Sequence, residues 1–388
     1  MTRRLSVLHI CGDYANQKLY SDLVSHLEAV GVSQFVFVPV RTPAELGINQ
    51  NECLEFTRYR FSYILKPWHR IFFRTKIRTI YNDICSNLDL NSVDVVHAHF
   101  LYSDGAVALR LKKKFRIPYV VVVRNTDINL FMRFRPDLNY LCTDILRHAH
   151  RIIFITPSYR ELLLQRLPCR LRAQVEAKTV IVPNGLSDFW LDNLRSTCAP
   201  TAQQIRLLYV GDFSKNKNIP NILRTAKLLI RSQDVSVSLA GSGGDGESFV
   251  DKMLASSEYP FAKRLGRIED RQKLLSIYRE HDILVMPSFR ETFGIAYLEA
   301  LSQGLPVIFS KGQGIDGYFS EGEIGESVDP HNIEDIQTKI SSLIVRLPVL
   351  QGACANAAKK FNWREIAYTY ADIYKVAAES RILKLGLK

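Results

Sequence analysis

The segment from His281 to Phe309 reads HDILVMPSFRETFGIAYLEALSQGLPVIF and decides the fold of this chain. Its apolar run at 283–286 has the length and composition of a buried strand, and a proline follows it. The loop SFRETFG comes next, and apolar residues at helical spacing then predict a helix over 294–303. A second apolar run at 306–309 completes a strand–helix–strand unit. This order predicts parallel strands joined by a helical crossover.

The loop of this unit carries charged and unpaired polar groups where it runs into the helix. Glu291 lies in the loop, and Glu299 lies eight residues further on, inside the predicted helix. Between them, Phe293, Gly294 and Ile295 present backbone N–H groups at a helix N-terminus, where unpaired amides and the helix dipole favour a diphosphate. Gly294 lets the backbone approach a phosphate closely. The alternative is a surface loop with one capping and one solvated glutamate.

The same alternation of strands and helices runs through most of the 388 residues. It predicts an α/β protein with two Rossmann-like, doubly wound domains. A Pro- and Gly-containing break at 182–185 separates a domain over 1–183 from a domain over 184–362, with a linker at about 184–205 and a last helix over 363–388. Ligands of open α/β sheets bind beyond the carboxyl ends of the strands, so we expect a cleft between the domains there. The predicted strands are 6–10, 34–38, 93–97, 118–123, 151–155, 179–182, 206–210, 235–240, 283–286 and 306–309.

The spacing E-x7-E, with FGI after the first glutamate and EALSQGLPVI from the second, resembles the family 4 retaining glycosyltransferases of the GT-B fold. The resemblance implies that Glu291 contacts hydroxyls of a donor sugar and that Glu299 holds the ribose of its nucleotide. It also implies that the amides of Phe293, Gly294 and Ile295 hold the diphosphate. The terminal FNW at 361–363 resembles the family's last signature, where the final helix braces the first domain.

A second match, YVGDFSKNKN at 209–218, follows the family pattern of a strand, a glycine and a phosphate-binding lysine. Gly211 ends the predicted strand, and Lys217 takes the lysine position, where a compact cation suits a diphosphate. Asp212 stands where the family has an arginine, so one positive phosphate contact is missing. The alternative for Lys217 is a solvated lysine in a basic turn.

Two further segments of the second half complete the predicted donor site. GSGGDG at 241–246 fits G-x-G-x-x-G formally, but the dinucleotide fingerprint belongs in the first βαβ unit. We therefore interpret Gly241 as backbone lining of a nucleotide cleft, with NAD binding as the alternative. The segment 265–268 resembles the family segment whose backbone faces the base, which adds Arg267 and Ile268.

The first half resembles the family less closely. DVVHAH at 94–99 puts His97 and His99 on one face of a strand, where a structural role is favoured over metal ligation. RNTD at 124–127 places Arg124 at the family's histidine, and an arginine can hold a phosphate or a sugar hydroxyl but cannot act as a base. The candidate catalytic residues are Glu291, Arg124 and Asp127, and the acceptor-side candidates are Gly12, Asp13 and Asn125.

The resemblance implies a reaction that moves a sugar, with retention, from a nucleoside diphosphate to a glycan or lipid-linked acceptor, and the family leads us to expect a uridine-linked donor. Such a reaction belongs to cell-surface polysaccharide assembly of the bacterial type. No D-x-D metal motif occurs in the sequence, so we predict a metal-independent enzyme with no cofactor beyond its nucleotide-sugar substrate. The alternative enzyme class is a glycoside hydrolase that uses Glu291 and Glu299 as its carboxylate pair.

The amino-acid composition narrows the remaining classes of protein and of binding partner. Seven scattered cysteines without a C-x-x-C pair argue against a disulfide framework or a zinc site and favour a reducing cytoplasm. No apolar run approaches the roughly 20 residues of a membrane helix. The net charge of +12 suits nucleic acid, an anionic membrane or phosphorylated substrates. No RNP-type, zinc-finger or basic-block signature accompanies it, so we expect no nucleic-acid partner.

The segment 58–84, RYRFSYILKPWHRIFFRTKIRTIYNDI, mixes basic and aromatic residues most densely. From Arg70 onward a helical pattern puts Arg70, Arg74 and Arg78 in a stripe beside an apolar face. One interpretation is a core helix with a solvated basic edge. The other is a peripheral contact with the inner face of an anionic membrane, with Trp68 and Phe72 at the interface.

Overall fold

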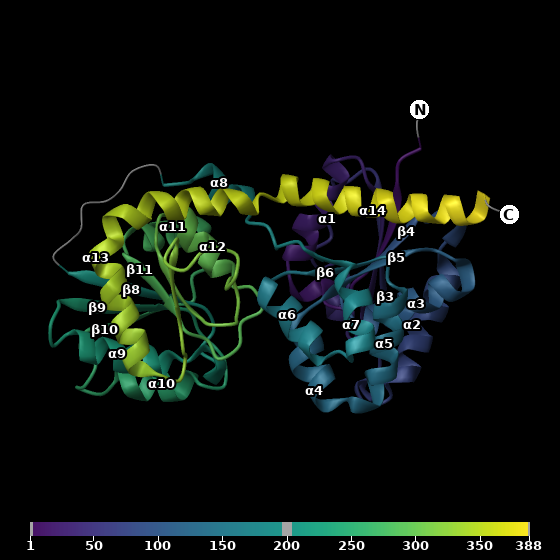
Figure 1. Cartoon of the computed structure of the whole chain (residues 1–388). Helices are drawn as coiled ribbons and strands as arrows, with labels where there is room; N and C mark the ends of the chain where they lie inside the picture. The colour runs from purple at the N-terminus through teal and green to yellow at the C-terminus, as the bar shows by residue number, and fades with distance from the viewer. Residues whose placement is uncertain (1–2, 196–203, 387–388) are drawn as a thin grey trace. The chain divides into compact units, whose positions relative to one another are not determined.

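A computed structural model describes residues 3–195 and 204–386 of the chain. The chain divides into two compact units, which we describe separately (Figure 1). Unit 1 comprises Met1–Ile155, Tyr159–Gly185 and Trp363–Lys388, and unit 2 comprises Thr156–Ser158 and Leu186–Asn362. Residues 196–203 of the predicted linker lie outside the described residues.

Unit 1 is built on a seven-stranded parallel sheet in the order β3-β2-β1-β4-β5-β6-β7. Each residue of β5 is buried, as expected where helices cover both faces of a parallel sheet. The order reverses between β1 and β4, which makes their carboxyl ends a topological switch point. The strands are β1 Ser6–Ile10, β2 Ser33–Val40, β3 Thr57–Tyr63, β4 Val95–Ala98, β5 Tyr119–Val123, β6 Arg151–Phe154 and β7 Thr179–Ile181.

The helices of unit 1 include the last one of the chain. Helix α14 packs along α1, and its Tyr374 hydroxyl lies 2.6 Å from His97 Nδ1 of β4 (Figure 1). At its start, the Trp363 ring lies so close to Gly185 that a Cβ there would collide with it. The helices are α1 Leu19–Ala29, α2 Phe73–Asn87, α3 Ser103–Phe115, α4 Met132–Phe134, α5 Asn139–His148, α6 Pro157–Arg166, α7 Cys169–Glu176 and α14 Trp363–Gly386.

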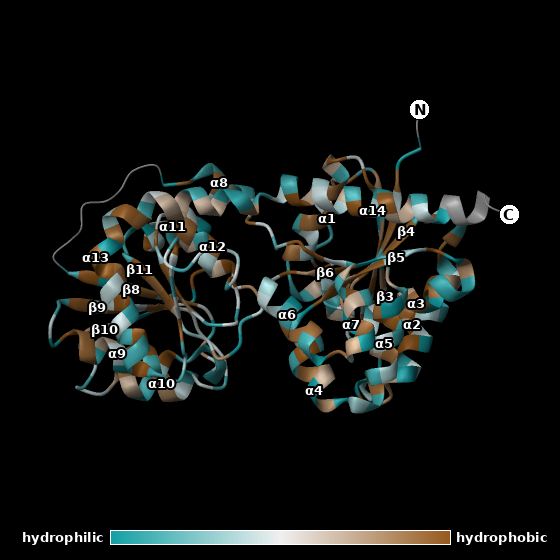
Figure 2. Cartoon of the chain, viewed as in Figure 1, coloured by the Kyte–Doolittle hydropathy of each residue, from teal (hydrophilic) through white to brown (hydrophobic). Residues whose placement is uncertain are grey.

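Unit 2 repeats the design with a six-stranded parallel sheet in the order β10-β9-β8-β11-β12-β13. The strands in the middle of both units are apolar (Figure 2). The reversal of order lies between β8 and β11. The strands are β8 Ile205–Val210, β9 Val235–Ala240, β10 Ala262–Gly266, β11 Ile283–Met286, β12 Val307–Ser310 and β13 Gly325–Val328. The helices are α8 Asp188–Asp192, α9 Ile219–Leu229, α10 Glu247–Leu254, α11 Arg271–Arg279, α12 Ile295–Ser302 and α13 Ile333–Ala358.

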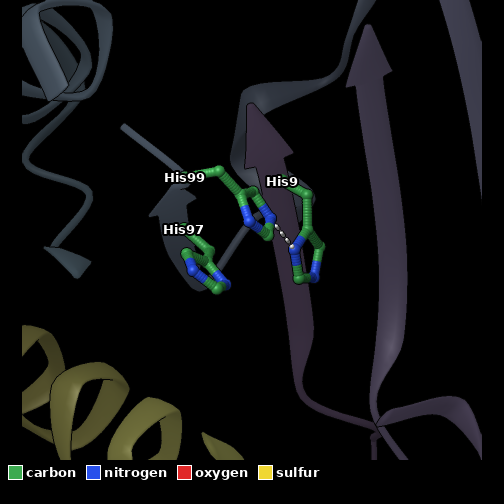
Figure 3. Close-up of side chains that lie close together, drawn as sticks. All are labelled: His9, His97 and His99. Atoms are coloured by element: carbon green, nitrogen blue, oxygen red, sulfur yellow. Dashed lines mark hydrogen bonds between the residues drawn. The ribbon is translucent and has the colours of Figure 1, made fainter. Parts of the chain in front are cut away.

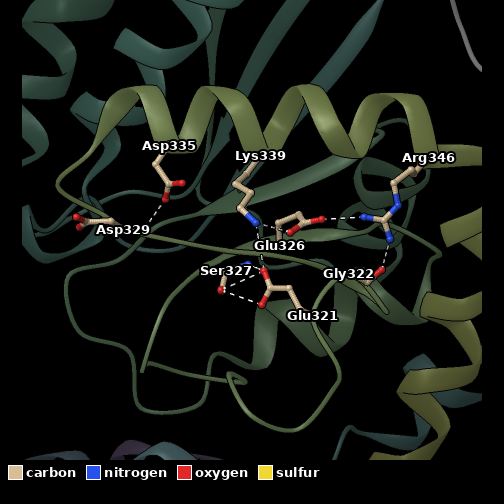
Figure 4. Close-up of polar contacts among 8 residues, drawn as sticks. All are labelled: Glu321, Gly322, Glu326, Ser327, Asp329, Asp335, Lys339 and Arg346. Carbon is tan, nitrogen blue, oxygen red and sulfur yellow. Dashed lines mark hydrogen bonds and ion pairs between the residues drawn. The ribbon is translucent and has the colours of Figure 1, made fainter.

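Helix α13 continues through Pro348 and is 26 residues long. With the turn that follows it, it is the one stretch among the described residues with the length and apolar composition of a membrane span. However, α13 packs against α9, α12 and β13, and two of its cations hold the buried Glu326 of β13 (Figure 4). Lys339 Nζ lies 2.9 Å from this carboxylate and Arg346 Nη1 lies 2.8 Å from it. These contacts are those of a core helix.

The predicted α/β class with two doubly wound sheets is confirmed. The ten predicted strands are all present, and three observed strands were not predicted: β3, β10 and β13. The strand β3 changes the interpretation of 58–84, because 58–63 belong to an edge strand of the sheet. The predicted amphipathic helix follows as α2, with Phe73, Ile77, Ile80 and Ile84 buried and Arg74 and Arg78 exposed.

Candidate active site

The carboxyl ends of β8, β9 and β10 in unit 2 surround a pocket of about 300 Å³. Glycines end these strands because the backbones approach too closely for side chains: a Cβ on Gly241 would overlap the carbonyl oxygen of Gly211. Gly241 N also donates to Gly266 O over 2.8 Å, which locks the neighbouring loop. The pocket brings together four predicted donor-site residues, Gly211, Gly241, Arg267 and Ile268, and its other lining residues are Val210, Asp212, Ala240, Ser242 and Leu274.

The loop after β11 carries Glu291, which is joined to the loop after β8. Lys217 Nζ lies 2.7 Å from Glu291 Oε2, and both side chains are mostly buried. Asn216 supports this pair, since its carbonyl accepts from Phe289 N at 2.9 Å and its side-chain amide donates to Arg290 O at 2.8 Å. Lys217 ends a short 3-10 turn rather than starting a helix, and Asn218 then takes a left-handed conformation before α9. The two strongest sequence motifs therefore meet in one ion pair.

The amides of Phe293, Gly294 and Ile295 lie at the N-terminus of α12. Gly294 has φ = +79°, and a Cβ there would collide with the Tyr297 ring, so this position requires glycine. Within residues 3–195 and 204–386, no acceptor forms a hydrogen bond with these three amides. Free amides at a helix N-terminus are suited to an anion.

Glu299 lies one to two turns into α12, and its carboxylate accepts a hydrogen bond of 2.9 Å from the Tyr278 hydroxyl of α11. Burial raises the pKa of Glu299, and the hydrogen bond from Tyr278 opposes this shift. Glu291 and Glu299 therefore have different partners, a lysine in one case and a tyrosine in the other.

In unit 1, Arg124 and Asp127 are both buried just beyond β5. Asp127 Oδ2 accepts from the backbone N–H groups of Arg124 (2.9 Å) and Leu101 (3.1 Å), and Oδ1 accepts from Tyr102 N (3.3 Å). Burial raises the pKa of Asp127 to about 6, and these hydrogen bonds oppose the shift. A carboxylate already engaged by three amides acts as a brace between the loops after β4 and β5.

Arg124 is held as firmly as Asp127. Its Nε donates to His99 O over 3.1 Å, and its guanidinium lies 4.9 Å from the centre of the Tyr20 ring and 5.5 Å from that of Phe100. Only 7% of the residue is exposed. The expectation that Arg124 reaches a substrate stays a prediction, and its contacts within unit 1 are those of a packed side chain.

The three acceptor-side residues lie near this brace. Gly12 and Asp13 follow β1, and Asp13 accepts from Asn16 Nδ2 at 2.8 Å and from Gln17 Nε2 at 2.7 Å. Asn125 accepts a hydrogen bond from Asn129. Beyond it, residues 127–131 form one turn of π-helix, an irregularity that is frequent at functional sites.

Comparison with known proteins identifies the family. The model of the glycosyl transferases group 1 matches residues 195–361, and that of glycosyltransferase family 4 matches residues 18–188. The chain belongs to the family 4 glycosyltransferases. An uncharacterized glycosyltransferase of Methanocaldococcus jannaschii is 24% identical over 75% of this chain and 77% of its own length. A D-inositol 3-phosphate glycosyltransferase of Corynebacterium kroppenstedtii is 25% identical over 74% of this chain and 68% of its own.

Solved structures show that this glycosyltransferase has the GT-B fold. Sucrose-phosphate synthase from Thermosynechococcus elongatus superposes with a TM-score of 0.78 at 18% identity, over 97% of this chain and all of that one. HepE of Anabaena, solved in complex with UDP, superposes with a TM-score of 0.70 at 15% identity, over 96% of this chain and all of that one. The predicted fold class and family are thus confirmed.

Near the carboxyl ends of β1 to β4, the glycosyltransferase has a cluster of charges that the sequence motifs did not indicate. Lys76 of α2 donates to the Ser103 hydroxyl at 2.8 Å, and Asp104 beside it is buried. Burial lowers the pKa of Lys76 and raises that of Asp104 to about 8, although each charge favours the ionised form of the other. The carboxyl group of Asp104 therefore compensates part of the charge of Lys76.

Arg41 and Arg70 add to this positive charge. Arg41 follows β2, and its pKa is lowered by burial and then by the charge of Arg70. The pKa of the buried His69 is lowered by burial and by Arg41 and Lys76, so the cations are close enough to repel one another. We call Arg41, Arg70 and Lys76 the basic cluster. Arg70 belongs to the basic stripe that the sequence predicted, whereas its meeting with Arg41, which follows β2, depends on the fold and has no local sequence signal.

The one group of metal-ligand residues found among the described residues is the fully buried set His9, His97 and His99 (Figure 3). Their candidate ligand atoms lie within 4.8 Å of one another. His9 Nδ1 and His99 Nε2 are hydrogen-bonded at 3.1 Å, and the rings of His97 and His99 stack at 4.0 Å. Burial lowers the pKa of all three, to about 3 for His9, and the charge of Arg124 further lowers those of His97 and His99.

A divalent cation in this set would meet the positive charge of Arg124, which acts on two of the three imidazoles. His97 is also engaged by Tyr374. The histidines are best explained as neutral, hydrogen-bonded packing between β1, β4 and α14, which was the favoured interpretation of the sequence.

Proposed function

We propose that this glycosyltransferase transfers a hexosyl group, with retention, from a uridine diphosphate sugar to an acceptor hydroxyl. The observation that carries the proposal is the Lys217–Glu291 ion pair of 2.7 Å, which joins the loop after β8 to the loop that presents the free amides of 293–295. The pocket lined by Gly211, Gly241 and Ile268 would take the nucleotide. The UDP and UDP-glucose complexes of the similarly folded HepE support this choice of donor.

In this proposal, unit 2 stabilises the leaving nucleoside diphosphate. Lys217 and the dipole of α12 would oppose the negative charge that builds on the diphosphate as the glycosidic bond breaks. These charges are fixed before the reaction, so the protein spends no energy on reorienting them. They also supply the neutralisation that a metal ion gives in other enzymes, and we therefore propose metal-independent catalysis. One carboxylate oxygen of Glu291 would accept a hydrogen bond from a sugar hydroxyl, while Lys217 donates to the other carboxylate oxygen.

We further propose that the acceptor carries an anionic group. The basic cluster supports this choice, because its mutually repelling cations would gain a counter-charge on binding. The names of relatives include D-inositol 3-phosphate and sucrose phosphate, which are phosphorylated compounds. A glycan or lipid-linked acceptor with a phosphate, at the cytoplasmic face of a membrane and in cell-surface polysaccharide assembly, fits these features and the net charge of +12.

A panel of nucleotide sugars tests the donor. At about 100 times its Kd, the true donor should add about 2.7 kcal/mol to the free energy of unfolding, whereas a nucleotide with the wrong base should add little. Retention should then be visible in the anomeric configuration of the product by NMR. The absence of stabilisation by any nucleoside diphosphate sugar, in a folded protein, would contradict the proposal.

The acceptor is tested with matched pairs of phosphorylated and dephosphorylated sugars or lipids. Arg41→Met and Lys76→Met should raise KM for the phosphorylated member by roughly 10-fold each, as expected for the loss of a charged hydrogen bond. Arg231→Met, at an exposed site in unit 2, is the control. An equal preference of wild type for both members of each pair would contradict an anionic acceptor.

A further inference from the structure

Unit 1 contains a pocket of about 430 Å³ that the proposed chemistry does not use. It lies between α2, α3 and α5, which are neighbours in the fold (Figure 1). Its walls are mostly apolar, with contributions from each of the three helices and from the turn before α5. The apolar lining residues are Phe73, Ile77, Ala106, Leu109, Leu138, Tyr140 and Leu141.

The charged residues of this pocket leave a positive rim. Asp144 is paired with Lys113 at 2.6 Å, and Asp137 is paired with Arg135 at 2.7 Å. The remaining two, Arg74 and Arg110, have no ion pair within the described part of the chain. The pocket therefore combines an apolar interior with two available guanidinium groups at its edge.

Large apolar side chains are exposed on two segments that also contribute lining residues to the pocket. Ile71 is 73% exposed and Tyr140 is 82% exposed, and Trp68, Phe72, Leu130 and Phe134 are each more than half exposed. The two segments that carry them, 68–74 and 130–140, are joined by a contact between the Phe73 and Phe131 rings at 5.9 Å. Arg135 also lies 5.9 Å from the centre of the Phe73 ring. We call the residues Trp68, Ile71, Phe72, Leu130, Phe134 and Tyr140 the apolar rim.

We propose that this face of unit 1 docks on an anionic phospholipid bilayer, with one acyl chain in the pocket and the lipid phosphate on Arg74 and Arg110. A contiguous exposed apolar patch marks an interaction site in soluble proteins. Aromatic and aliphatic side chains beside cations suit the boundary between acyl chains and headgroups. Available arginines on the same face provide the charge complementarity to anionic lipid. The proposal deepens the membrane location proposed above, but it does not depend on the identity of the donor.

The chain offers a built-in probe of this docking. Of its three tryptophans, Trp190 and Trp363 are buried, and only Trp68 is exposed. On vesicles of phosphatidylglycerol and phosphatidylcholine in equal parts, we expect Trp68 emission to shift to shorter wavelength and to be quenched by brominated acyl chains. Trp68→Phe should remove both signals without removing sedimentation with the vesicles.

Paired variants of the full chain test the surface. Ile71→Ser with Phe72→Ser, and separately Arg74→Glu with Arg110→Glu, should each lower vesicle binding by at least 10-fold. Ala106→Phe, which fills the pocket and leaves its rim intact, should lower binding to a smaller extent. The controls are Val345→Ser with Val349→Ser, which are about 80% exposed on α13 of unit 2, and Arg224→Glu with Arg231→Glu. Both controls should bind like wild type.

Stabilisation by the nucleotide sugar shows whether each variant is folded and keeps the two proposals apart. A variant that loses vesicle binding but keeps donor stabilisation supports the docking surface. Failure of wild type to bind phosphatidylglycerol vesicles at low salt, or equal binding by the paired variants, would overturn the proposal whatever the donor result. Binding to pure phosphatidylcholine as tight as to the anionic mixture would overturn the role of the two arginines. Vesicle binding without any donor stabilisation would refute the proposed function and leave the docking proposal standing.

Discussion

The carboxyl ends of the strands carry different chemistry in the two units. In unit 2 they carry an open pocket lined in part by glycines, and the loops there also present the free amides of 293–295 and one ion pair. In unit 1 the polar groups at the same edge are buried and already engaged: Asp127 by three amides and Arg124 by a carbonyl and two rings. Unit 2 therefore presents free hydrogen-bond donors to a ligand, whereas the polar groups at this edge of unit 1 mostly hold its own loops in place.

In the proposed function unit 2 binds the charged leaving group, and substitution of Glu291 should have the largest effect on transfer. Glu291→Gln keeps the side-chain volume and an acceptor for Lys217 but removes the charge near the sugar. We expect the transfer rate to fall by roughly 10²-fold or more while the fold is kept. Initial rates with the donor found by thermal stabilisation measure this loss.

Unit 2 offers a closely matched control for Glu291. Glu326 is also a mostly buried glutamate paired with a lysine, but it lies between β13 and α13, among structural contacts (Figure 4). Glu326→Gln should therefore lower stability and leave the transfer rate per folded molecule near that of wild type. If Glu291→Gln turns over like wild type, Glu291 has no part in transfer.

The second largest effect is expected for Lys217. Lys217→Met should weaken binding of the free nucleoside diphosphate by about 1.5–3 kcal/mol, which is the range for a hydrogen bond to a charged group. The substitution also leaves Glu291 without its partner, so the double variant Lys217→Met with Glu291→Gln separates the loss of the cation from the unpaired carboxylate. Calorimetric titration gives the affinities, with Lys339→Met as the control. Unchanged affinity in both variants would place Lys217 outside the site.

The difference between the units also explains what the sequence could predict. Gly211, Gly241, Gly294 and the 293–295 amides act through backbone geometry, and glycine and turn patterns over a few residues encode that geometry. The strand β3 was missed because its alternating basic and aromatic residues resemble an interfacial segment, and it forms an edge strand with only part of it buried. The sequence pointed to Trp68, Phe72 and Arg70 within one basic and aromatic segment. It did not indicate that Arg41, Leu130, Phe134 and Tyr140 join them, because these residues come from distant segments and no local pattern specifies such a meeting.

A residue that only braces two loops should respond to substitution differently from a catalytic residue, and Asp127 provides that test. In Asp127→Asn one oxygen can still accept from Leu101 and Arg124, but the new amide faces the N–H of Tyr102 and cannot accept from it. We expect the free energy of unfolding of unit 1 to fall by about 1–3 kcal/mol, the cost of leaving a buried donor unsatisfied. Urea unfolding measures the loss, and affinity for the nucleoside diphosphate should stay unchanged. A stable Asp127→Asn protein with abolished transfer would instead make Asp127 catalytic.

The smallest expected effect concerns pH and the buried histidines of unit 1. The pKa of each of His9, His97 and His99 is lowered from 6.5 by burial, so the folded state keeps them neutral while the unfolded chain binds protons below about pH 6.5. Their contribution to stability is therefore complete above pH 6.5 and is lost as the pH falls, by up to about 1.4 kcal/mol per pH unit for each histidine. Asp104 and Asp127 act in the opposite sense, because a raised carboxyl pKa in the folded state favours that state as the pH falls. The slope of the free energy of unfolding against pH contains the contributions of all these histidines and carboxyl groups. The difference between the slopes of wild type and His99→Asn gives the contribution of His99 alone. Between pH 6.5 and 5, the free energy of unfolding should fall less steeply in His99→Asn than in wild type. The pKa of the buried His281 in unit 2 is also lowered, but its burial is less complete. His281→Asn should therefore change the slope less than His99→Asn does. Parallel pH curves for wild type and His99→Asn would mean that His99 titrates alike in the folded and unfolded chain, and the neutral histidine packing of unit 1 would then be wrong.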